Sequence, residues 1–95
     1  MGAWYVYIVQ CVDDSLYTGV AKNIAARLAQ HNAGTGAKYT RGRGPVVLVY
    51  QEPAVDHGAA LRKEHVLKQL SPAAKRALIE TGRVQDAQVL YESTS

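Results

Sequence analysis

Five side chains of this 95-residue chain could together carry hydrolytic chemistry: Tyr7, Tyr17, Arg27, His31 and Glu64. They supply two phenols, a permanent cation, an imidazole and a carboxylate that could bind a metal ion. Proton transfer, stabilisation of developing negative charge and metal binding together suffice to hydrolyse a phosphodiester. None of the five is diagnostic alone, so each is weighed against an ordinary structural role.

Glu64 most needs an explanation, because Ala60 and Leu61 lie one helical turn before it and Leu67 lies one turn after it. This spacing puts a carboxylate within an apolar helix face. An unpaired buried charge is costly, so the group must be neutralised, hydrogen-bonded or bound to a cation. The residues alone favour a salt bridge, for example to Lys68 four residues later.

Arg27 and His31 are four residues apart in a segment of helical composition, so they point the same way, at the border of the buried face. Arg27 could pack its aliphatic stem and leave the guanidinium in water, or it could donate to phosphate oxygens. The residues leave these two roles equal. His31 could relay a proton or orient a phosphate, although a lone histidine on a helix edge is more often structural.

The two tyrosines belong to a predicted antiparallel hairpin, with strands over residues 4–12 and 16–20 and a turn at residues 13–15. Tyr17 then lies across from the middle of the first strand, near the face that holds Tyr7. Both faces of the first strand carry apolar residues, which predicts a sheet covered on two sides. Clustered phenols are more informative than scattered ones.

A basic loop over residues 33–45 is a second candidate for function, because three cations surround one aromatic residue: Lys38, Tyr39, Arg41 and Arg43. Such a loop could contact nucleic acid or could simply be solvated. The residues alone leave both interpretations open.

The rest of the chain predicts a small mixed fold. We expect a helix over residues 21–32 that stops before Gly34 and Gly36, a strand over 46–50, a helix from Asp56 to about residue 70, and a third from Ser71-Pro72 to near Gly82. Residues 83–95 are ambiguous between a short strand and a loosely held tail.

Composition limits the compartment and the partners. Cys11 is the only cysteine, so no internal disulfide can form and the cytoplasm is the simplest location. No apolar run approaches the roughly 20 residues of a membrane-spanning helix, and no secretory signal is visible. A net charge of +3 with a pI near 9.2 is compatible with a polyanionic partner. Zinc is not expected, because no set of His and Cys has suitable spacing.

In their order and spacing, several short stretches of the chain resemble the GIY-YIG endonuclease superfamily, most closely its small single-domain bacterial members of the UPF0213 type. The resemblance covers residues 4–80 and is carried by Tyr5-Val6-Tyr7, Leu16-Tyr17-Thr18-Gly19, residues 27–32, Lys38-Tyr39-Thr40-Arg41, residues 45–50, Leu61-Arg62-Lys63-Glu64 and Lys68. Three positions depart from the two signatures: Tyr5, Val6 and Thr18. Val20 stands where some relatives carry a lysine thought to activate a tyrosine.

The resemblance implies an α+β fold, with a three-stranded antiparallel sheet flanked by helices in one domain of residues 1–82. It also implies metal-dependent hydrolysis of DNA by in-line attack of water. A single Mg²⁺ (or Mn²⁺) would be held by Glu64, water and phosphate oxygens. Tyr7 or Tyr17 would be the base or orient the water, His31 would assist, and Arg27 would offset phosphoryl charge. The implied nucleic-acid contacts are Gly19, Lys38, Tyr39, Arg41, Arg43 and Lys68.

Two other functions remain open from the sequence: a non-catalytic nucleic-acid-binding module and a protein-interaction domain. For the nuclease, larger relatives obtain specificity from appended DNA-binding domains that are not visible in this chain. We therefore expect selectivity for DNA structure, with branched, damaged and single-stranded DNA as candidates, or specificity supplied by a partner protein.

Overall fold

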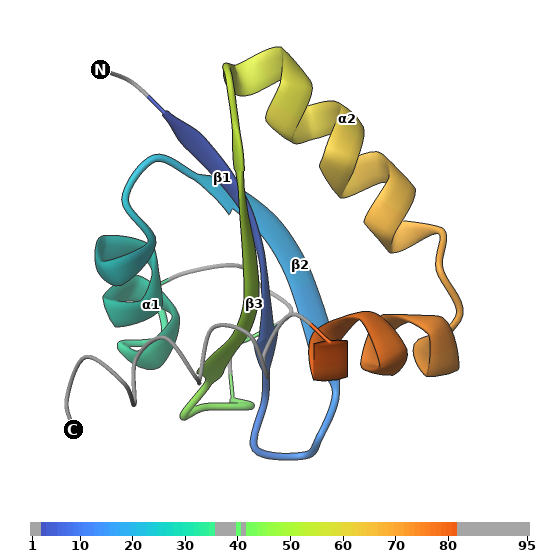
Figure 1. Cartoon of the computed structure of the whole chain (residues 1–95). Helices are drawn as coiled ribbons and strands as arrows, with labels where there is room; N and C mark the ends of the chain where they lie inside the picture. The colour runs from blue at the N-terminus through green and yellow to red at the C-terminus, as the bar shows by residue number, and fades with distance from the viewer. Residues whose placement is uncertain (1–2, 36–39, 41, 82–95) are drawn as a thin grey trace, which may run out of the picture.

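The computed structural model describes residues 3–35, 40 and 42–81, which form an antiparallel sheet with helices on both faces (Figure 1). The sheet has the strand order β2-β1-β3, with β1 (Trp4–Gln10), β2 (Leu16–Ala21) and β3 (Val47–Ala54). The helices are α1 (Ile24–Asn32), α2 (His57–Lys68) and a third over residues 72–81. The predicted α+β fold is confirmed.

The β1–β2 hairpin forms where turn residues separate two apolar segments. The backbone N–H and the hydroxyl of Ser15 both donate to Asp13 Oδ1, and Asp14 adopts a positive φ of 69°. The resulting register pairs Tyr7 with Gly19 and Val9 with Tyr17. Since alternate residues share a face of a sheet, Tyr7 and Tyr17 lie on the same face, as predicted.

Helix α1 begins three residues later than expected. Ala21 is still paired with Tyr5 in the sheet, and Asn23 caps the helix by accepting a hydrogen bond from the Ala26 N–H. The helix ends as predicted before Gly34, whose φ of +82° suits glycine.

The second half of the described chain follows local capping chemistry. The Asp56 carboxylate accepts from the Ala59 N–H at the start of α2, and the Ser71 hydroxyl accepts from the Ala74 N–H at the start of the third helix. β3 runs to Ala54, beyond the predicted end at residue 50, because an edge strand tolerates Pro53.

Two hydrophobic clusters cover the two faces of the sheet, which confirms the prediction of two-sided burial. The cluster on the α1 face contains Tyr7, Val9, Cys11, Ala21 and Val46. The cluster on the α2 face contains Val6, Ile8, Val49, Leu67 and Ile79. Figure 1 shows α1 on one side of the sheet and α2 on the other.

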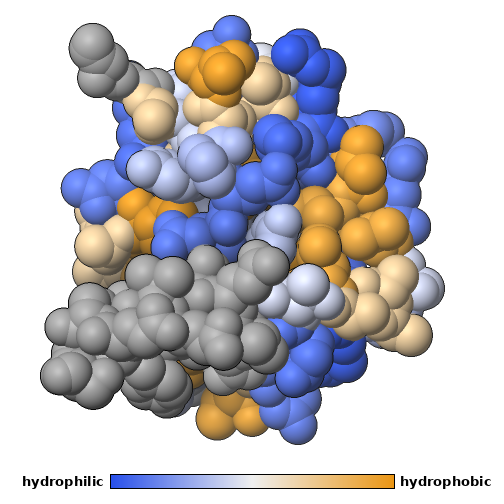
Figure 2. Space-filling model, viewed as in Figure 1, coloured by the Kyte–Doolittle hydropathy of each residue, from blue (hydrophilic) through white to orange (hydrophobic). Residues whose placement is uncertain are grey.

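In the described part of the chain, no helix is long and apolar enough to cross a membrane. The prediction for residues 83–95, a short strand or a tail, lies outside the described residues. Apolar side chains also reach the surface over α2 (Figure 2), where Leu61 and Val66 are exposed.

Candidate active site

A buried chain of three polar side chains lies under α1. The Tyr7 hydroxyl is 3.0 Å from His31 Nε2, and His31 Nδ1 is 2.8 Å from the Thr40 hydroxyl. Each of the three residues is at most 2% exposed. The sheet supplies Tyr7, α1 supplies His31, and the loop before β3 supplies Thr40. Their mutual hydrogen bonds satisfy groups that would otherwise be costly to bury.

This chain has two self-consistent hydrogen patterns, because one nitrogen of a neutral imidazole donates and the other accepts. In one pattern the Tyr7 phenol donates to Nε2 and the Nδ1–H donates to Thr40. In the other pattern every bond is reversed. The Thr40 hydroxyl can accept in the first pattern and donate in the second, so it holds the imidazole ring in either tautomer. In the first pattern the phenol proton of Tyr7 points at His31 Nε2.

The pKa values of Tyr7 and His31 are displaced in opposite directions. Burial, helped by the nearby Tyr17, raises the pKa of Tyr7 to about 12, although the charge and hydrogen bonding of Arg27 act to lower it. Burial, followed by the charge of Arg27, lowers the pKa of His31. At neutral pH the pair is therefore a phenol beside an uncharged imidazole. The charge of Arg27 acts to lower the pKa of Tyr7, but burial outweighs it.

Tyr17 and Gly19 of β2 pack around the same pair. The Tyr17 ring meets the His31 imidazole edge-on, with centroids 5.4 Å apart. A Cβ atom on Gly19 would lie 2.6 Å from the Tyr7 hydroxyl oxygen, so only glycine leaves room for this phenol. A nucleic-acid contact at Gly19 stays a prediction.

Arg27 lies at the open margin of the cluster. Its side chain is exposed on α1, and its Nη1 donates to Gln30 Oε1 over 3.0 Å. Its charge affects the pKa of both Tyr7 and His31, which places it beside the buried pair. A guanidinium at this margin can face solvent and a phosphate while its charge acts on the phenol.

Glu64 forms the ion pair that the sequence favoured, with its Oε2 3.1 Å from Lys68 Nζ. Its side chain is only 19% exposed, and its charge contributes to raising the pKa of Tyr7. The carboxylate therefore acts electrostatically on the same site as Arg27. The prediction of an apolar helix face around Glu64 is partly wrong. Ala60 and Leu67 are buried, but Leu61 is 43% exposed.

The prediction of a Mg²⁺ or Mn²⁺ ion at Glu64 can be compared with the metal-ligating side chains of the described residues. The described residues contain no group of three or more His, Cys, Asp or Glu side chains that could hold a metal ion. A lone, half-buried carboxylate such as Glu64 fits Mg²⁺, which is often bound by one or two carboxylates together with waters and substrate phosphates.

The predicted basic loop is described only in part, because Lys38, Tyr39 and Arg41 lie outside the described residues. Arg43 forms an ion pair with Asp13, 2.9 Å between Nη1 and Oδ2, and its carbonyl accepts from the Val12 N–H. These contacts join the loop to the β1–β2 turn. Nucleic-acid contacts by Arg43 and Lys68 stay predictions.

Sequence reasoning missed two features next to this site. Thr40 belongs to a stretch that carried the family resemblance, but nothing in its type or spacing indicated a bond to His31. Trp4 stacks on the His57 ring, with centroids 4.1 Å apart, and the Lys22 ammonium lies 5.6 Å from the Trp4 ring centre. The sequence offered a single tryptophan at the start of the first strand, and nothing in its spacing linked it to Lys22 or His57.

Comparisons with known proteins identify the family of this chain. Residues 3–77 match the family described as the GIY-YIG catalytic domain. A UPF0213 protein of Desulfotalea psychrophila is 47% identical over 94 residues, covering 98% of this chain and 86% of the relative. A UPF0213 protein of Staphylococcus haemolyticus is 54% identical over 80 residues, covering 84% of this chain and 98% of the relative.

Solved structures show the same fold. The solution NMR structure of a UPF0213 protein from Bacillus halodurans superposes with a TM-score of 0.54 at 42% identity, covering 83% of this chain and 84% of that one. A solution NMR structure from E. faecalis gives a TM-score of 0.56 at 33% identity, covering 82% and 84%. The chain therefore belongs to the GIY-YIG superfamily, a nuclease superfamily, and within it to the UPF0213 proteins. The domain type implies a nucleic-acid substrate.

Proposed function

We propose that this protein is a divalent-metal-dependent nuclease that hydrolyses DNA phosphodiesters by in-line attack of water. The observation that carries the proposal is the buried hydrogen bond between the Tyr7 phenol and a neutral His31, beside Arg27. A protein that only bound DNA would have no use for a proton acceptor behind a phenol. Selectivity for DNA structure and a contribution from a partner protein belong to the same proposal.

Tyr7 passes on the proton of the attacking water in this mechanism. With a pKa near 12 its phenolate is too scarce at neutral pH to act as a preformed base. Instead the phenol takes a proton from water while it gives its own to His31 Nε2. Neutral His31 is the final acceptor, and the proton on Nδ1 stays bonded to Thr40. Tyr17 holds the imidazole from its edge.

Arg27 and Glu64 supply the electrostatic part of the mechanism. Arg27 donates to the phosphoryl oxygens, where negative charge develops during attack. Glu64 would hold the metal ion together with waters and phosphate oxygens, and a bound Mg²⁺ or Mn²⁺ supplies Lewis-acid stabilisation of the departing oxygen. Lys68, which pairs with Glu64 in the structure, would then turn toward the DNA backbone.

The alternative is a non-catalytic nucleic-acid-binding module. The specific observation that opposes it is Glu64, whose charge bears on Tyr7 and would repel a phosphate at the site in the absence of a metal ion. A binding module would keep the cations of this face and have no need of that carboxylate.

The test is a cleavage assay with labelled single-stranded, duplex and branched DNA, in Mg²⁺ or in chelator. We expect cleavage of at least one substrate in Mg²⁺, and none in chelator or with Glu64→Gln. Glu52→Gln is the matched control, because Glu52 is also held by a lysine, with its Oε2 2.6 Å from Lys63 Nζ, but it does not contribute to the pKa of Tyr7.

Absence of cleavage on every substrate would overturn the proposal, as would equal cleavage by wild type and Glu64→Gln. Salt-dependent DNA binding without cleavage would instead support the binding module.

A further inference from the structure

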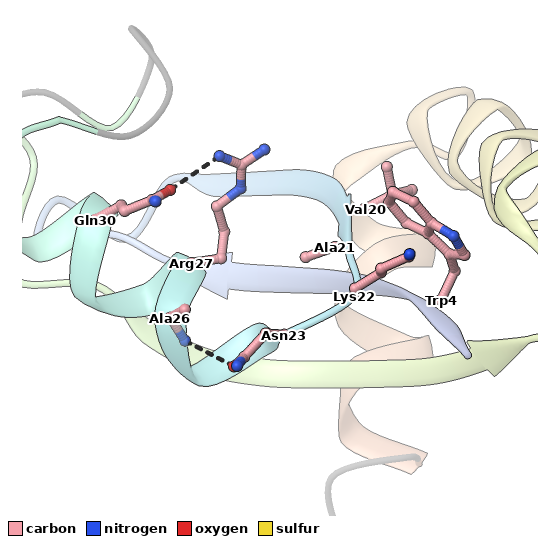
Figure 3. A pocket seen from close by; sticks show the side chains of 8 residues that line it. All are labelled: Trp4, Val20, Ala21, Lys22, Asn23, Ala26, Arg27 and Gln30. Atoms are coloured by element: carbon pink, nitrogen blue, oxygen red, sulfur yellow. Dashed lines mark hydrogen bonds between the residues drawn. The ribbon is translucent and has the colours of Figure 1, made fainter. Parts of the chain in front are cut away.

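A hollow of about 260 Å³ opens beside Arg27, at the edge of the sheet where β2 ends. Figure 3 shows Trp4 on one side, Arg27 and Gln30 of α1 on the other, and Lys22 and Asn23 on the connection between them. The hydrolytic mechanism uses Arg27 but gives no role to the other four side chains.

Trp4 presents a fixed aromatic surface at this hollow. Its half-buried ring is stacked on His57 of α2, with the two planes 20° apart, so the ring is supported from behind. The Lys22 ammonium lies over the ring, 5.6 Å from its centre, so a ligand that stacks on the face away from His57 displaces the ammonium to its own edge. An aromatic ring with an adjacent cation is the pair that single-strand-binding proteins use, the ring for a base and the cation for its phosphate.

The polar side chains of Asn23 and Gln30, which line the hollow, suit the edge of a base. Among the described residues, the side-chain hydrogen bonds of Asn23 and Gln30 use their oxygens, which accept from Ala26 and Arg27. Their NH₂ groups remain as donors, which match the acceptor atoms that every base carries. The volume lies just below the roughly 300 to 1,000 Å³ of pockets for drug-sized ligands and suits a single base.

We propose that this hollow binds an unpaired nucleobase of the substrate strand, next to the phosphate that Arg27 contacts. The inference rests on the proposed function and names its substrate class: single-stranded DNA, or a duplex with unpaired nucleotides at the cleaved bond. A paired base is excluded, because its two faces are stacked and its pairing edge is occupied. Lys22 then neutralises the neighbouring phosphate.

Trp4 makes the proposal directly measurable, since it is the only tryptophan of the chain. A short single-stranded oligonucleotide is titrated into the wild-type protein in chelator, beside an abasic oligonucleotide with the same length and charge. We expect the base-bearing strand to quench Trp4 fluorescence and to bind about 5- to 150-fold more tightly, the range for loss of one stacked base. The same sequence as a blunt duplex should quench weakly.

Variants separate stacking from general attraction, with affinity read from the anisotropy of a labelled strand. Trp4→Ala should abolish the preference for the base-bearing strand, whereas Trp4→Phe should keep most of it. Lys22→Gln should weaken both strands equally and reduce the salt dependence by about one phosphate contact. Arg62→Gln is its matched control, because Arg62 lines a different hollow, formed with Glu52, Lys63, Val66 and Leu67. Urea unfolding of each variant confirms that it is folded.

Equal affinity of wild type for the two strands, without quenching, would overturn the base site even if the protein cleaved DNA. A base preference that survives in folded Trp4→Ala would overturn it as well. Base-dependent quenching in a protein that cleaves no DNA would support the site and overturn the nuclease proposal.

Discussion

The two faces of the sheet share the central strand β1 but are built differently. On the α2 face, β1 contributes Val6 and Ile8 to an apolar cluster, and the ion pair between Glu52 and Lys63 lies at its half-exposed margin. On the α1 face, β1 contributes Tyr7, which buries a hydrogen-bonded chain through His31. On the α2 face β1 supplies apolar packing, whereas on the α1 face it places a polar group in the interior at a cost that needs a functional reason.

The largest expected effect compares one tyrosine from each face. Tyr7→Phe should lower kcat by about 10²- to 10⁴-fold, because the water proton loses its route to His31. Tyr50→Phe removes a phenol on the α2 face that donates to Glu52 over 2.9 Å, and should leave kcat unchanged. Single-turnover cleavage at saturating Mg²⁺ measures both.

Stability separates this prediction from a folding defect. Tyr7→Phe leaves a buried imidazole nitrogen unpaired and should lose about 1 to 2 kcal/mol in urea unfolding, whereas Tyr50→Phe removes a part-buried bond to Glu52 and should lose about 1 kcal/mol. A similar fall in kcat for both variants would mean that the faces do not differ in function.

The alkaline stability of the protein should depend on Tyr7. Its pKa is raised from 10.0 to about 12, so the folded state holds this proton where the unfolded state has lost it. The stabilisation is complete below the unfolded pKa and is lost as pH rises, by about 1 kcal/mol at pH 11 and about 2 kcal/mol near pH 12. Urea unfolding of wild type should show this extra loss relative to Tyr7→Phe.

Tyr50→Phe is the control for the alkaline loss of stability, since it keeps Tyr7 and removes a tyrosine on the other face. Other lysines and tyrosines titrate in all three proteins, and their effect cancels in the difference. Parallel alkaline curves for wild type and Tyr7→Phe would show that Tyr7 is not held as a buried phenol.

Much of this architecture could be predicted because it follows from local chemistry. Asp56 and Ser71 cap helices as their types and positions indicated. The hairpin register follows from the turn at residues 13–15. The errors occurred where tertiary pairing overrides local preference: Ala21 has a good helix propensity, yet it pairs with Tyr5 in the sheet.

The residues of the candidate site could be predicted from the sequence, but the hydrogen bonds that connect them could not. Helical spacing alone puts Arg27 and His31 on one side of α1. The bond from His31 to Thr40 depends on how a loop returns to the sheet, and the raised pKa of Tyr7 depends on complete burial. Neither this bond nor this pKa follows from residue type or short-range spacing.

The finest comparison uses two buried threonines, one on each face. Thr40 bonds to His31, whereas Thr18 lies between Leu16 and Val20 of the α2 face, and its buried hydroxyl has no partner among the described residues. Thr→Val keeps the shape and removes the hydroxyl. Thr40→Val should lose about 1 to 2 kcal/mol, because it leaves an imidazole nitrogen unpaired, whereas Thr18→Val should be neutral or stabilising.

Activity distinguishes a positioning role for Thr40 from a purely structural one. Cleavage requires neutral His31, so kcat/KM should fall as pH falls through the His31 pKa, which burial lowers below its ordinary value. In the pattern that the mechanism uses, Thr40 accepts from the Nδ1–H of His31, so Thr40→Val removes this acceptor and should lower kcat and move this acid limb. Thr40→Ser should restore both, since it returns the hydroxyl, and Thr18→Val should change neither. An unmoved limb in Thr40→Val would mean that the hydroxyl only fills space beside the imidazole.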